Sequence, residues 1–288
     1  MTCGRKGHIS EQMARQPFTI LSPSPGAGTT MKIATYNVNS LRKRIDILHP
    51  WLRRHKPDVM CLQETKVQDH DFPLEAFADL PYVINYCGQK SYNGVAILSR
   101  VEPEEVAFGF QDGEDQEDSA RLARVVIQGI PIINTYIPQG FALDSPKYAY
   151  KLEWFCRLKR YFSRNISADK PAIWCGDMNV APEPVDVHHP EKHVKHVCFH
   201  EDARRAYQNT VSWGFVDVFR HHYPRRQQFT FWDYRRPDAL EANRGWRIDH
   251  MMVTPSLLTH SQTITVDVNA RKAEQPSDHT ILWADFSV

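Results

Sequence analysis

Short apolar segments typical of β-strands recur along most of this chain and constrain its fold more than any other feature. The expected strands cover residues 31–38, 57–65, 82–88, 94–100, 104–110, 123–129, 130–138, 171–179, 228–234, 246–254, 263–268 and 281–286. Few helices separate them, and a similar strand–helix order occurs twice. Two sheets packed on each other with helices outside would accommodate this pattern. We therefore expect one α/β (α+β) domain, a four-layered sandwich of two packed mixed β-sheets flanked by helices, over residues 31–288.

Two segments carry clear helix signals. In residues 145–162, Ser145 can cap the helix N-terminus and Pro146 suits the first turn, while apolar residues recur at helical spacing. Residues 200–214 are expected to form a second helix that is closed by Gly214.

Two other segments carry mixed signals. Residues 44–55 have helical spacing, but Pro50 lacks a hydrogen-bond donor, so we expect a kink or a late start of that helix. Residues 111–118 contain five acidic residues in eight positions. We expect them to form a solvated loop.

The first thirty residues differ from the rest. They show no periodic pattern and end in a stretch rich in Ser, Pro, Gly and Thr. Their short apolar run does not suit a secretory signal. We expect residues 1–30 to be a disordered N-terminal extension or read-through from an upstream start, and residues 31–288 to be the catalytic domain.

Cysteine usage and hydropathy bear on the compartment. The six cysteines are scattered without a CxxC pair, which is typical of buried, reduced thiols. No apolar run approaches the ~20 residues of a membrane span. We expect a protein without a membrane partner in a reducing compartment, namely the cytoplasm, associated with the nucleoid if the source is a bacterium.

Polar residues gather where the apolar strands end. They are Asn37, Asn39, Gln63, Glu64, Tyr136, Asp177, Asn179, Asp249, Asp278 and His279. Asn and Asp at a single strand end are usually turn formers. So many strand ends that carry carboxylates, amides and a histidine together indicate one polar site.

The segment Ser277-Asp278-His279 could belong to a serine-hydrolase triad, a metal site or a turn. Neighbouring side chains on extended backbone point to opposite sides, so Asp278 is poorly placed to orient the ring of His279. Asp249, in the stretch RIDH, is the candidate for that task, which leaves Asp278 free to face elsewhere.

A histidine-rich stretch is an alternative candidate for a metal site. Its histidines are His188, His189, His193, His196 and His200. Their spacing resembles neither HExxH nor a zinc finger. We favour a polar loop.

Several motifs together resemble the exonuclease III family of apurinic/apyrimidinic endonucleases, within the wider endonuclease–exonuclease–phosphatase superfamily. They are YNVNSLR, PDVMCLQETK, SYNGVAILSR, YIPQG, CGDMNVAP, DVFR, FTFWDYR, NRGWRIDH and SDH. The resemblance covers nearly all of residues 31–288. FTFWDYR and NRGWRIDH point to its DNA-repair branch.

The resemblance implies a divalent metal, Mg²⁺ or Mn²⁺, with Glu64 as its main ligand and with Asn39 and Asp278 beside it. Such a hard cation prefers carboxylate and water oxygens and bridges to a substrate phosphate. Asn37 and Tyr136 would contact the same phosphate.

The resemblance also implies the remaining catalytic roles. Asp177, supported by Asn179, would orient and deprotonate the attacking water. His279, held by Asp249, would bind the scissile phosphate as an imidazolium. The metal, its hydration water or Tyr136 would stabilise the leaving 3′-oxygen.

The resemblance further implies substrate-binding residues. Phe231 and Trp246 would form the walls of a pocket for an extruded abasic sugar, which has no base stacking to lose. Trp232, Arg235 and Gln139 would contact DNA nearby. Without the resemblance, FTFWDYR is equally an ordinary core strand with a charged exit.

The expected function is cleavage of DNA 5′ to apurinic/apyrimidinic sites, with 3′→5′ exonuclease and 3′-end-cleaning activity, by a monomer. Its partner would be double-stranded DNA with abasic sites or 3′ ends. Because the net charge is only +1, contacts with phosphates would need local groups such as residues 42–44 and 147–151, which are otherwise solvated faces.

Two alternatives stay open: a general endonuclease or inositol-phosphate phosphatase on the same scaffold, and a non-catalytic DNA-binding relative. Two segments depart from the family. No Arg or Glu follows Gly140, and the stretch after residue 190 is rich in histidine where the family often has Asn and Arg. His193, Lys195 and His196 would replace them as phosphate donors.

Overall fold

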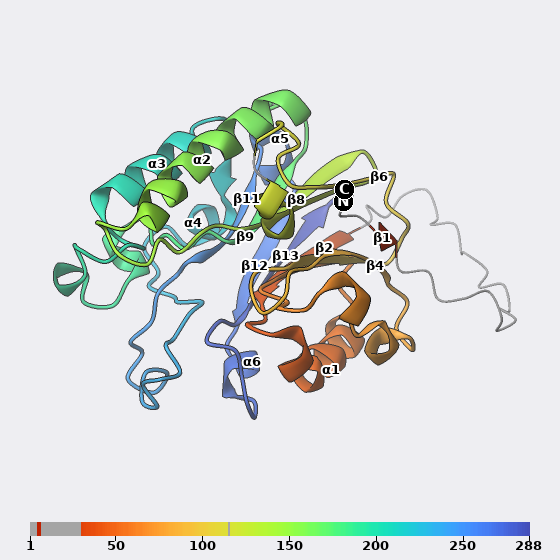
Figure 1. Cartoon of the computed structure of the whole chain (residues 1–288), viewed down its shortest axis with the longest axis horizontal. Helices are drawn as coiled ribbons and strands as arrows, with labels where there is room; N and C mark the ends of the chain where they lie inside the picture. Colours follow the sequence, from red (N-terminus) through yellow and green to blue (C-terminus); the bar gives the residue numbers. More distant parts are fainter. Residues whose placement is uncertain (1–4, 7–29, 115) are drawn as a thin grey trace, which may run out of the picture.

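The computed structural model describes residues 5–6, 30–114 and 116–288, and its strands form two sheets (Figure 1). The seven-stranded sheet, in the order β1-β4-β5-β3-β2-β13-β12, consists of β1 (Arg5–Lys6), β2 (Thr30–Asn37), β3 (Val59–Gln63), β4 (Val83–Cys87), β5 (Val95–Ser99), β12 (Ser261–Asp267) and β13 (Ile281–Ser287). The six-stranded sheet, in the order β10-β11-β9-β8-β7-β6, consists of β6 (Glu105–Phe108), β7 (Leu122–Ile127), β8 (Ile130–Tyr136), β9 (Ile173–Asp177), β10 (Val216–Asp217) and β11 (Asp249–Val253). The pairs β2–β3 and β8–β9 are parallel and the other pairs are antiparallel, so both sheets are mixed.

The described α-helices are α1 (Ile45–His55), α2 (Pro146–Asn165), α3 (Glu201–Val211), α4 (Val218–His222), α5 (Pro255–Leu258) and α6 (Asn269–Lys272). Short 3-10 helices span Leu41–Lys43, Asp69–Asp71, Leu74–Phe77, Gln116–Arg121, Pro184–Asp186 and Pro190–Lys192. None of the helices in the described part of the chain is long and apolar enough to cross a membrane.

The sheets pack face to face around an apolar core, and helices cover their outer faces (Figure 1). On the outside of the seven-stranded sheet, α1 buries Leu48 and Leu52 against the strands. On the outside of the six-stranded sheet, α2 and α3 bury side chains such as Trp154 and Tyr207. This arrangement confirms the expected four-layered sandwich.

The capping signal of α2 is borne out by its geometry. The Oγ of Ser145 accepts a hydrogen bond from the backbone N–H of Lys147 at 3.1 Å, and Pro146 occupies the first helical position. A side-chain oxygen at this position satisfies one of the free N–H groups of the first turn. The helix therefore begins where the sequence predicts.

Of the two effects expected from Pro50, the late start of the helix is wrong and the kink stays a prediction. Helix α1 runs continuously from Ile45 to His55 and contains Pro50 in its second turn. The ring removes one intrahelical hydrogen bond, to the carbonyl of Asp46. Both residues lie on the exposed side of the helix, while its buried face is held by apolar packing.

The strand expected at 228–234 is also absent. Phe231 forms single β-bridges to Trp246 and to His279, and the N–H of Trp232 donates to the carbonyl of Asp278 at 2.8 Å. Within two residues the backbone pairs with two different segments. It therefore cannot continue as a regular ladder with either of them. The segment is therefore irregular.

The acidic stretch 111–118 is not simply a solvated loop. The side chain of Arg157 is buried and lies 3.0 Å from Asp112, and it also pairs with the buried carboxylate of Asp118. A buried guanidinium needs such partners because an unpaired charge there would be strongly destabilising.

The cysteines follow the expectation in part. Cys61, Cys175 and Cys198 carry free, buried thiols, and Cys156 has a free thiol but is exposed. Cys87 is disulfide-bonded, so the expectation of reduced thiols fails there.

Little of the expected N-terminal extension is described. Within residues 1–30 the structure covers only Arg5–Lys6, which pair antiparallel with β4, and Thr30, where β2 begins. The expected disorder falls on residues outside the described ones. The domain boundary at residue 31 stays a prediction.

Candidate active site

Strand ends from both sheets meet at one edge of the sandwich. Because β2 and β3 are parallel, Asn37 and Gln63 end together, and the parallel pair β8 and β9 likewise places Tyr136 opposite Asp177. Strand β11 is antiparallel to β9 and begins at this edge, with Asp249 opposite Asp177. The topology therefore brings together residues that are far apart in the sequence.

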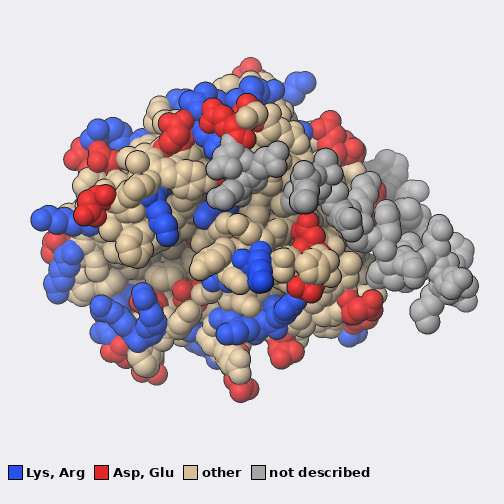
Figure 2. Space-filling view, viewed as in Figure 1, with Lys and Arg blue, Asp and Glu red and all other residues tan. Residues whose placement is uncertain are grey.

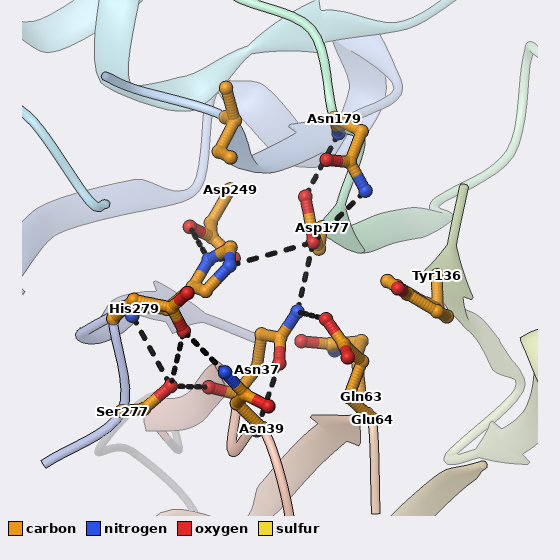
Figure 3. Close-up of polar contacts among 12 residues, drawn as sticks. Asn37, Asn39, Gln63, Glu64, Tyr136, Asp177, Asn179, Asp249, Ser277 and His279 are labelled. Carbon is orange, nitrogen blue, oxygen red and sulfur yellow. Dashed lines mark hydrogen bonds and ion pairs between the residues drawn. The ribbon is translucent and has the colours of Figure 1, made fainter. Parts of the chain in front are cut away.

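The amide of Asn37 joins the two sheets at this edge (Figure 3). Its Nδ2 donates to Oδ2 of Asp177 at 2.9 Å and to Oε1 of Glu64 at 2.8 Å. Asn37 ends β2 and Glu64 directly follows β3, both in the seven-stranded sheet, whereas Asp177 ends β9 in the six-stranded sheet. The predicted metal ligand and the predicted base thus share one donor.

Asp177 is buried and held in a fixed orientation. The backbone N–H of Asn179 donates to its Oδ1 at 2.9 Å, and the side-chain Nδ2 of Asn179 donates to its Oδ2 at 3.2 Å. Burial raises the pKa of Asp177 to about 7, and the carboxylates of Asp249 and Glu64 act in the same direction against the lowering effect of His279. A carboxylate with this pKa can accept a proton near neutral pH.

His279 and Asp249 form a buried pair. Nδ1 of His279 lies 2.8 Å from Oδ2 of Asp249, and its Nε2 lies 3.7 Å from Oδ2 of Asp177. Burial alone would lower the pKa of His279, but Asp249 and Asp177 raise it to about 10. The ring is therefore an imidazolium at neutral pH, with its Nε2–H toward the site.

Asp278 turns away from His279, as the sequence predicts. Its Oδ1 accepts from Nδ2 of Asn39 at 2.9 Å. Ser277 is fully buried, and its Oγ donates to the carbonyl of Asn37 at 2.8 Å and accepts from the N–H of His279 at 3.2 Å. Ser277 thus holds the turn that carries His279.

The residues around Glu64 suit a hard divalent cation. The Nζ of Lys66 lies 2.8 Å from Oε2 of Glu64 and also donates to Oδ1 of Asn39, so a positive charge already sits between two predicted metal ligands. Burial would raise the pKa of Glu64, but Lys66 lowers it, and the group is a carboxylate at neutral pH. Oxygen donors of this kind, with Asp278 beside them, match the preference of Mg²⁺ or Mn²⁺.

Three potential ligand atoms, one each from Glu64, Asp177 and His279, also lie within 4.8 Å of one another. His279 is nevertheless unsuited to ligate a metal, because both nitrogens of an imidazolium carry hydrogens and offer no lone pair. The two carboxylates are the better candidates.

The backbone is strained at this edge. Glu64, Lys66, Asn39 and Asn179 adopt positive φ angles of 52°, 53°, 41° and 50°. Asn tolerates this region, whereas Glu and Lys rarely enter it. Such strain is concentrated at functional sites, where surrounding contacts hold it in place.

Tyr136 is a further polar group beside the carboxylates of Glu64 and Asp177. Burial, with Glu64 and Asp177 nearby, raises the pKa of its hydroxyl well above the ordinary value. Its ring is covered by the guanidinium of Arg121, whose carbon lies 4.7 Å from the ring centroid. Tyr136 therefore remains a hydrogen-bond donor at any physiological pH.

These groups form the base of a cavity of about 420 Å³. It is lined by Glu64, Tyr136, Gln139, Asp177, Asn179, His188, His193, His196, Cys198, Phe231, Asp233, Arg235, Arg236, Arg244, Trp246, Ile248, Asp278 and His279. Figure 2 shows a hollow on this face of the molecule with Lys and Arg side chains on several sides. Carboxylates thus lie at the base, with aromatic and basic side chains on the walls.

Among the predicted substrate-binding residues, Phe231, Trp246, Arg235 and Gln139 line the cavity. Trp232 does not, and that expectation is wrong. Its side chain is 1% exposed and packs against Phe229 and Ala239 in a separate small core.

Two of the basic residues expected on the surface are buried. Lys151 is fully buried, and its Nζ donates to the carbonyls of Gln139, Asn179 and Val197 at 3.2, 2.8 and 2.8 Å. Arg44 is 7% exposed and donates to the carbonyl of Pro276 at 2.9 Å. These two side chains therefore hold loops together and are not free to contact a phosphate.

Several site residues carried no assigned role in the sequence, namely Lys66, Arg236, Arg244 and Ile248. Lys66 lies in the quoted motif LQETK, two residues from Glu64, and that spacing was the available signal. Conversely, Gln63 faces the core between the sheets, where its Nε2 donates to Oδ1 of Asn134 at 2.6 Å.

The histidine-rich loop packs against the aromatic wall. The ring centroids of His193 and His196 lie 4.8 and 4.5 Å from that of Trp246, and the centroid of His188 lies 6.0 Å from it. The loop is thus part of the cavity wall, and its interpretation as a polar loop instead of a metal site stays a prediction.

Comparison with known proteins agrees with this geometry. Residues 34–279 match the family described as the Endonuclease/Exonuclease/phosphatase family. The chain is 32% identical to exodeoxyribonuclease III of Haemophilus influenzae over 267 residues, which are 89% of this chain and 100% of that protein.

Two solved structures are also similar. An AP endonuclease from Archaeoglobus fulgidus has a TM-score of 0.87 and 50% identity, covering 90% of this chain and 100% of that one. A 3′ phosphatase from Neisseria, bound to a product DNA hairpin, has a TM-score of 0.84 and 35% identity with the same coverage. The chain therefore belongs to the endonuclease/exonuclease/phosphatase family, within its group of exodeoxyribonuclease III and AP endonucleases.

Proposed function

We propose that this protein is a DNA-repair phosphodiesterase that requires Mg²⁺ or Mn²⁺ and cleaves duplex DNA 5′ to apurinic/apyrimidinic sites. It also removes nucleotides or blocking groups from 3′ ends. The observation that carries the proposal is the junction in which Asn37 joins Asp177 to Glu64 beneath an aromatic wall. Because one chain supplies every group of the site, we propose that the protein acts as a monomer. We also propose that it is located in the cytoplasm.

In this mechanism Asp177 accepts the proton of the attacking water. Asn179 and Asn37 fix its carboxylate, so the lone pair that takes the proton has a defined direction. General-base catalysis of this kind contributes about 10²–10⁴-fold. The amide of Asn37 also limits Asp177 to one orientation relative to Glu64.

His279 and Tyr136 stabilise the charge that develops on the phosphate. The imidazolium donates from Nε2, and Asp249 holds the ring so that no reorganisation is needed during the reaction. Tyr136, always protonated, donates to a phosphate oxygen or to the leaving 3′-oxygen. Glu64, with Asn39 and Asp278 beside it, would hold a divalent ion, which would supply additional neutralisation of phosphate charge.

The aromatic wall supports an abasic nucleotide as the preferred substrate. Phe231, whose ring centroid lies 5.0 Å from that of His279, and Trp246 lie beside the phosphate-binding groups. A sugar without a base can enter such a pocket at little unstacking cost, whereas a normal nucleotide cannot. Arg235, Arg236 and Arg244 on the rim supply contacts for flanking phosphates.

The proposal is tested with a duplex that carries one abasic analogue, incubated with enzyme and Mg²⁺ or with a chelator. We expect one cut with a 3′-hydroxyl on the upstream fragment, and no cut with the chelator. Parallel assays on undamaged duplex and on inositol phosphates address the general endonuclease and phosphatase alternatives. Cleavage of inositol phosphates with an intact abasic duplex would refute the proposal, and tight binding without any cleavage would favour the non-catalytic alternative.

Replacing Ser277 with Ala is expected to preserve most of the activity and to lower stability. The hydroxyl is buried, donates to the carbonyl of Asn37 at the end of β2 and accepts from the N–H of His279, so its loss should cost about 1–2 kcal/mol of unfolding free energy. Urea denaturation and steady-state kinetics measure the two effects. A loss of activity comparable to that of an Asp177 variant would instead revive a role as nucleophile.

The pH dependence of kcat/KM should be bell-shaped, with its plateau between about pH 7 and pH 10. Asp177 must be ionised and its pKa is raised to about 7, so the rate falls as the pH drops below that value. His279 must be protonated and its pKa is raised to about 10, so the rate falls at higher pH. Replacing Asp249 with Asn removes a carboxylate that raises the His279 pKa and should move the alkaline limb to lower pH. An unmoved limb would assign it to another group.

Phe141 is expected to contact DNA. It follows Gly140 on the loop of the cavity-lining residue Gln139, is 75% exposed and has a φ of 62°, which is rare for a bulky side chain. Replacing it with Ala should weaken binding of abasic duplex by about 5–150-fold, since stacking of a base on an aromatic ring contributes ~1–3 kcal/mol. The control is Val101→Ala, another exposed apolar residue that follows β5 at the opposite edge. Equal affinities of both variants would contradict the assignment.

A further inference from the structure

Two rings of the histidine-rich loop face each other on the cavity wall. His188 and His193 both line the cavity, and their Nε2 atoms lie 3.3 Å apart. Neither residue has a part in the mechanism described above. Their contact is a nitrogen–nitrogen one, so at most one hydrogen can lie between the two atoms.

The tautomer of His188 is fixed by a backbone contact. Its Nδ1 lies 3.1 Å from the carbonyl oxygen of Gly245. A carbonyl only accepts, so Nδ1 must carry the hydrogen, and the Nε2 of the neutral ring offers a lone pair toward His193. Histidines that ligate metals are oriented in the same way, by donating their other nitrogen to a carbonyl or carboxylate.

Both rings are suited to be neutral ligands. Burial of the ring lowers the pKa of His188 and of His193 below the ordinary value. In the metal-free protein the Nε2–H of His193 donates to His188. Binding of a cation needs this hydrogen to move to Nδ1 of His193, a change of tautomer that neither consumes nor releases a proton overall.

The separation of the two nitrogens matches one metal ion. Two ligands about 2.0–2.1 Å from a tetrahedral ion lie roughly 3.3–3.4 Å apart, and this is the geometry and bond length of Zn²⁺ bound to histidine. Imidazole pairs select Zn²⁺, Ni²⁺ or Cu²⁺ over Mg²⁺, which prefers oxygen ligands. The pair is therefore complementary to a different class of metal from the Glu64 site.

The neighbouring histidine is not a third ligand. Nδ1 of His196 accepts the N–H of Cys198 at 3.2 Å, so its neutral ring carries the hydrogen on Nε2 and has no free lone pair. The remaining coordination positions of an ion on His188 and His193 would be left to solvent or to a ligand that enters the cavity.

We propose that His188 and His193 form a second metal site, for Zn²⁺ or a related transition-metal ion, on the wall of the cavity. The role of this site rests on the proposed function: an ion there adds positive charge beside Trp246, where a phosphate oxygen of bound DNA can take one open position. Metal binding itself does not depend on that role.

The site is tested by titrating the full-length protein with Co²⁺ in excess Mg²⁺ and recording the visible absorption of tetrahedral Co²⁺. One equivalent is expected to give these bands, and Zn²⁺ should displace them. His188→Gln and His193→Gln should each weaken Co²⁺ binding by at least about tenfold, equivalent to ~1.4 kcal/mol. Glu64→Gln should keep the bands, which separates this site from the one at Glu64.

The matched control is His189→Gln, an exposed histidine next to His188 whose Nδ1 lies 3.5 Å from Glu191; its ring contacts that of His188 edge-on, with 5.8 Å between the centroids, but is not part of the nitrogen pair. It should bind Co²⁺ like the unmodified chain, and metal-free thermal melting confirms that each variant is folded. Bands that survive in both His188→Gln and His193→Gln, or that disappear in His189→Gln as well, would overturn the site.

A second measurement tests the role in DNA binding. Affinity for an abasic duplex that resists cleavage is measured with and without Zn²⁺ in the unmodified chain and in His193→Gln. A Zn²⁺-dependent gain of about threefold or more only in the unmodified chain supports the role. Histidine-dependent Co²⁺ bands without that gain would keep the metal site and remove its DNA role. Because the bands need no turnover, their outcome is independent of whether abasic DNA is cleaved.

Discussion

Replacing Asp177 with Asn is expected to lower kcat for cleavage of abasic duplex by about 10³-fold or more, with little change in DNA affinity. The amide keeps the shape of the carboxylate, but its single oxygen can accept either from Asn37, which now donates to Oδ2, or from the N–H of Asn179, which now donates to Oδ1. It cannot accept the proton of the attacking water at any pH of interest. The substitution therefore removes the proposed base and one hydrogen bond, and keeps the volume of the side chain.

Single-turnover kinetics with saturating enzyme and Mg²⁺ measure this effect, and an equilibrium binding assay in chelator checks affinity. Asp144→Asn, at an exposed position on a loop outside the cavity, is the matched control. If Asp177→Asn retained roughly a tenth of the activity or more, another group would have to deprotonate the water.

Replacing His279 with Ala is expected to lower kcat by a similar factor, about 10³-fold, because the scissile phosphate loses its buried cationic donor. Asp249→Ala alone should be severe as well, since the ring then loses both its orientation and the carboxylate that keeps it protonated. The two residues act as one unit, so the double variant should be little worse than His279→Ala.

A double-mutant cycle on kcat provides this measurement. Fully additive losses would show that Asp249 has a task apart from the ring. Circular dichroism and thermal melting accompany the cycle, because removing Asp249 leaves a buried imidazole without its partner.

The fold was predictable because its signals are local. Alternating and fully apolar segments of strand length mark nearly every strand, and the cap at Ser145 marks the start of α2. Two of the mispredictions, the late start of α1 at Pro50 and the strand at residues 228–234, arise from non-local effects. Pro50 is tolerated because tertiary packing holds α1, and residues 228–234 have strand composition while their partners lie on two different segments.

The candidate site was predictable to the extent that polar residues end apolar strands. The sequence cannot say which of two neighbouring aromatics faces a cavity, and Phe231 does so while Trp232 is buried. It also cannot separate Lys147, an exposed residue, from the buried Lys151 in the same helix, since burial depends on the loops that cover them. The catalytic roles of the converging residues stay predictions until the variants are measured.

The amide of Asn37 forms hydrogen bonds across the interface between the two sheets. This affects which amino-acid substitutions the enzyme tolerates. The proposed catalytic groups are divided between the two sheets. The thickness of the apolar core between the sheets therefore determines how far apart these groups lie. Protein interiors are close-packed, and a misplacement of about 1 Å can cost ~10²-fold in rate. Substitutions among the valines and isoleucines of this core, far from the bound phosphate, should therefore lower kcat before they cause measurable unfolding.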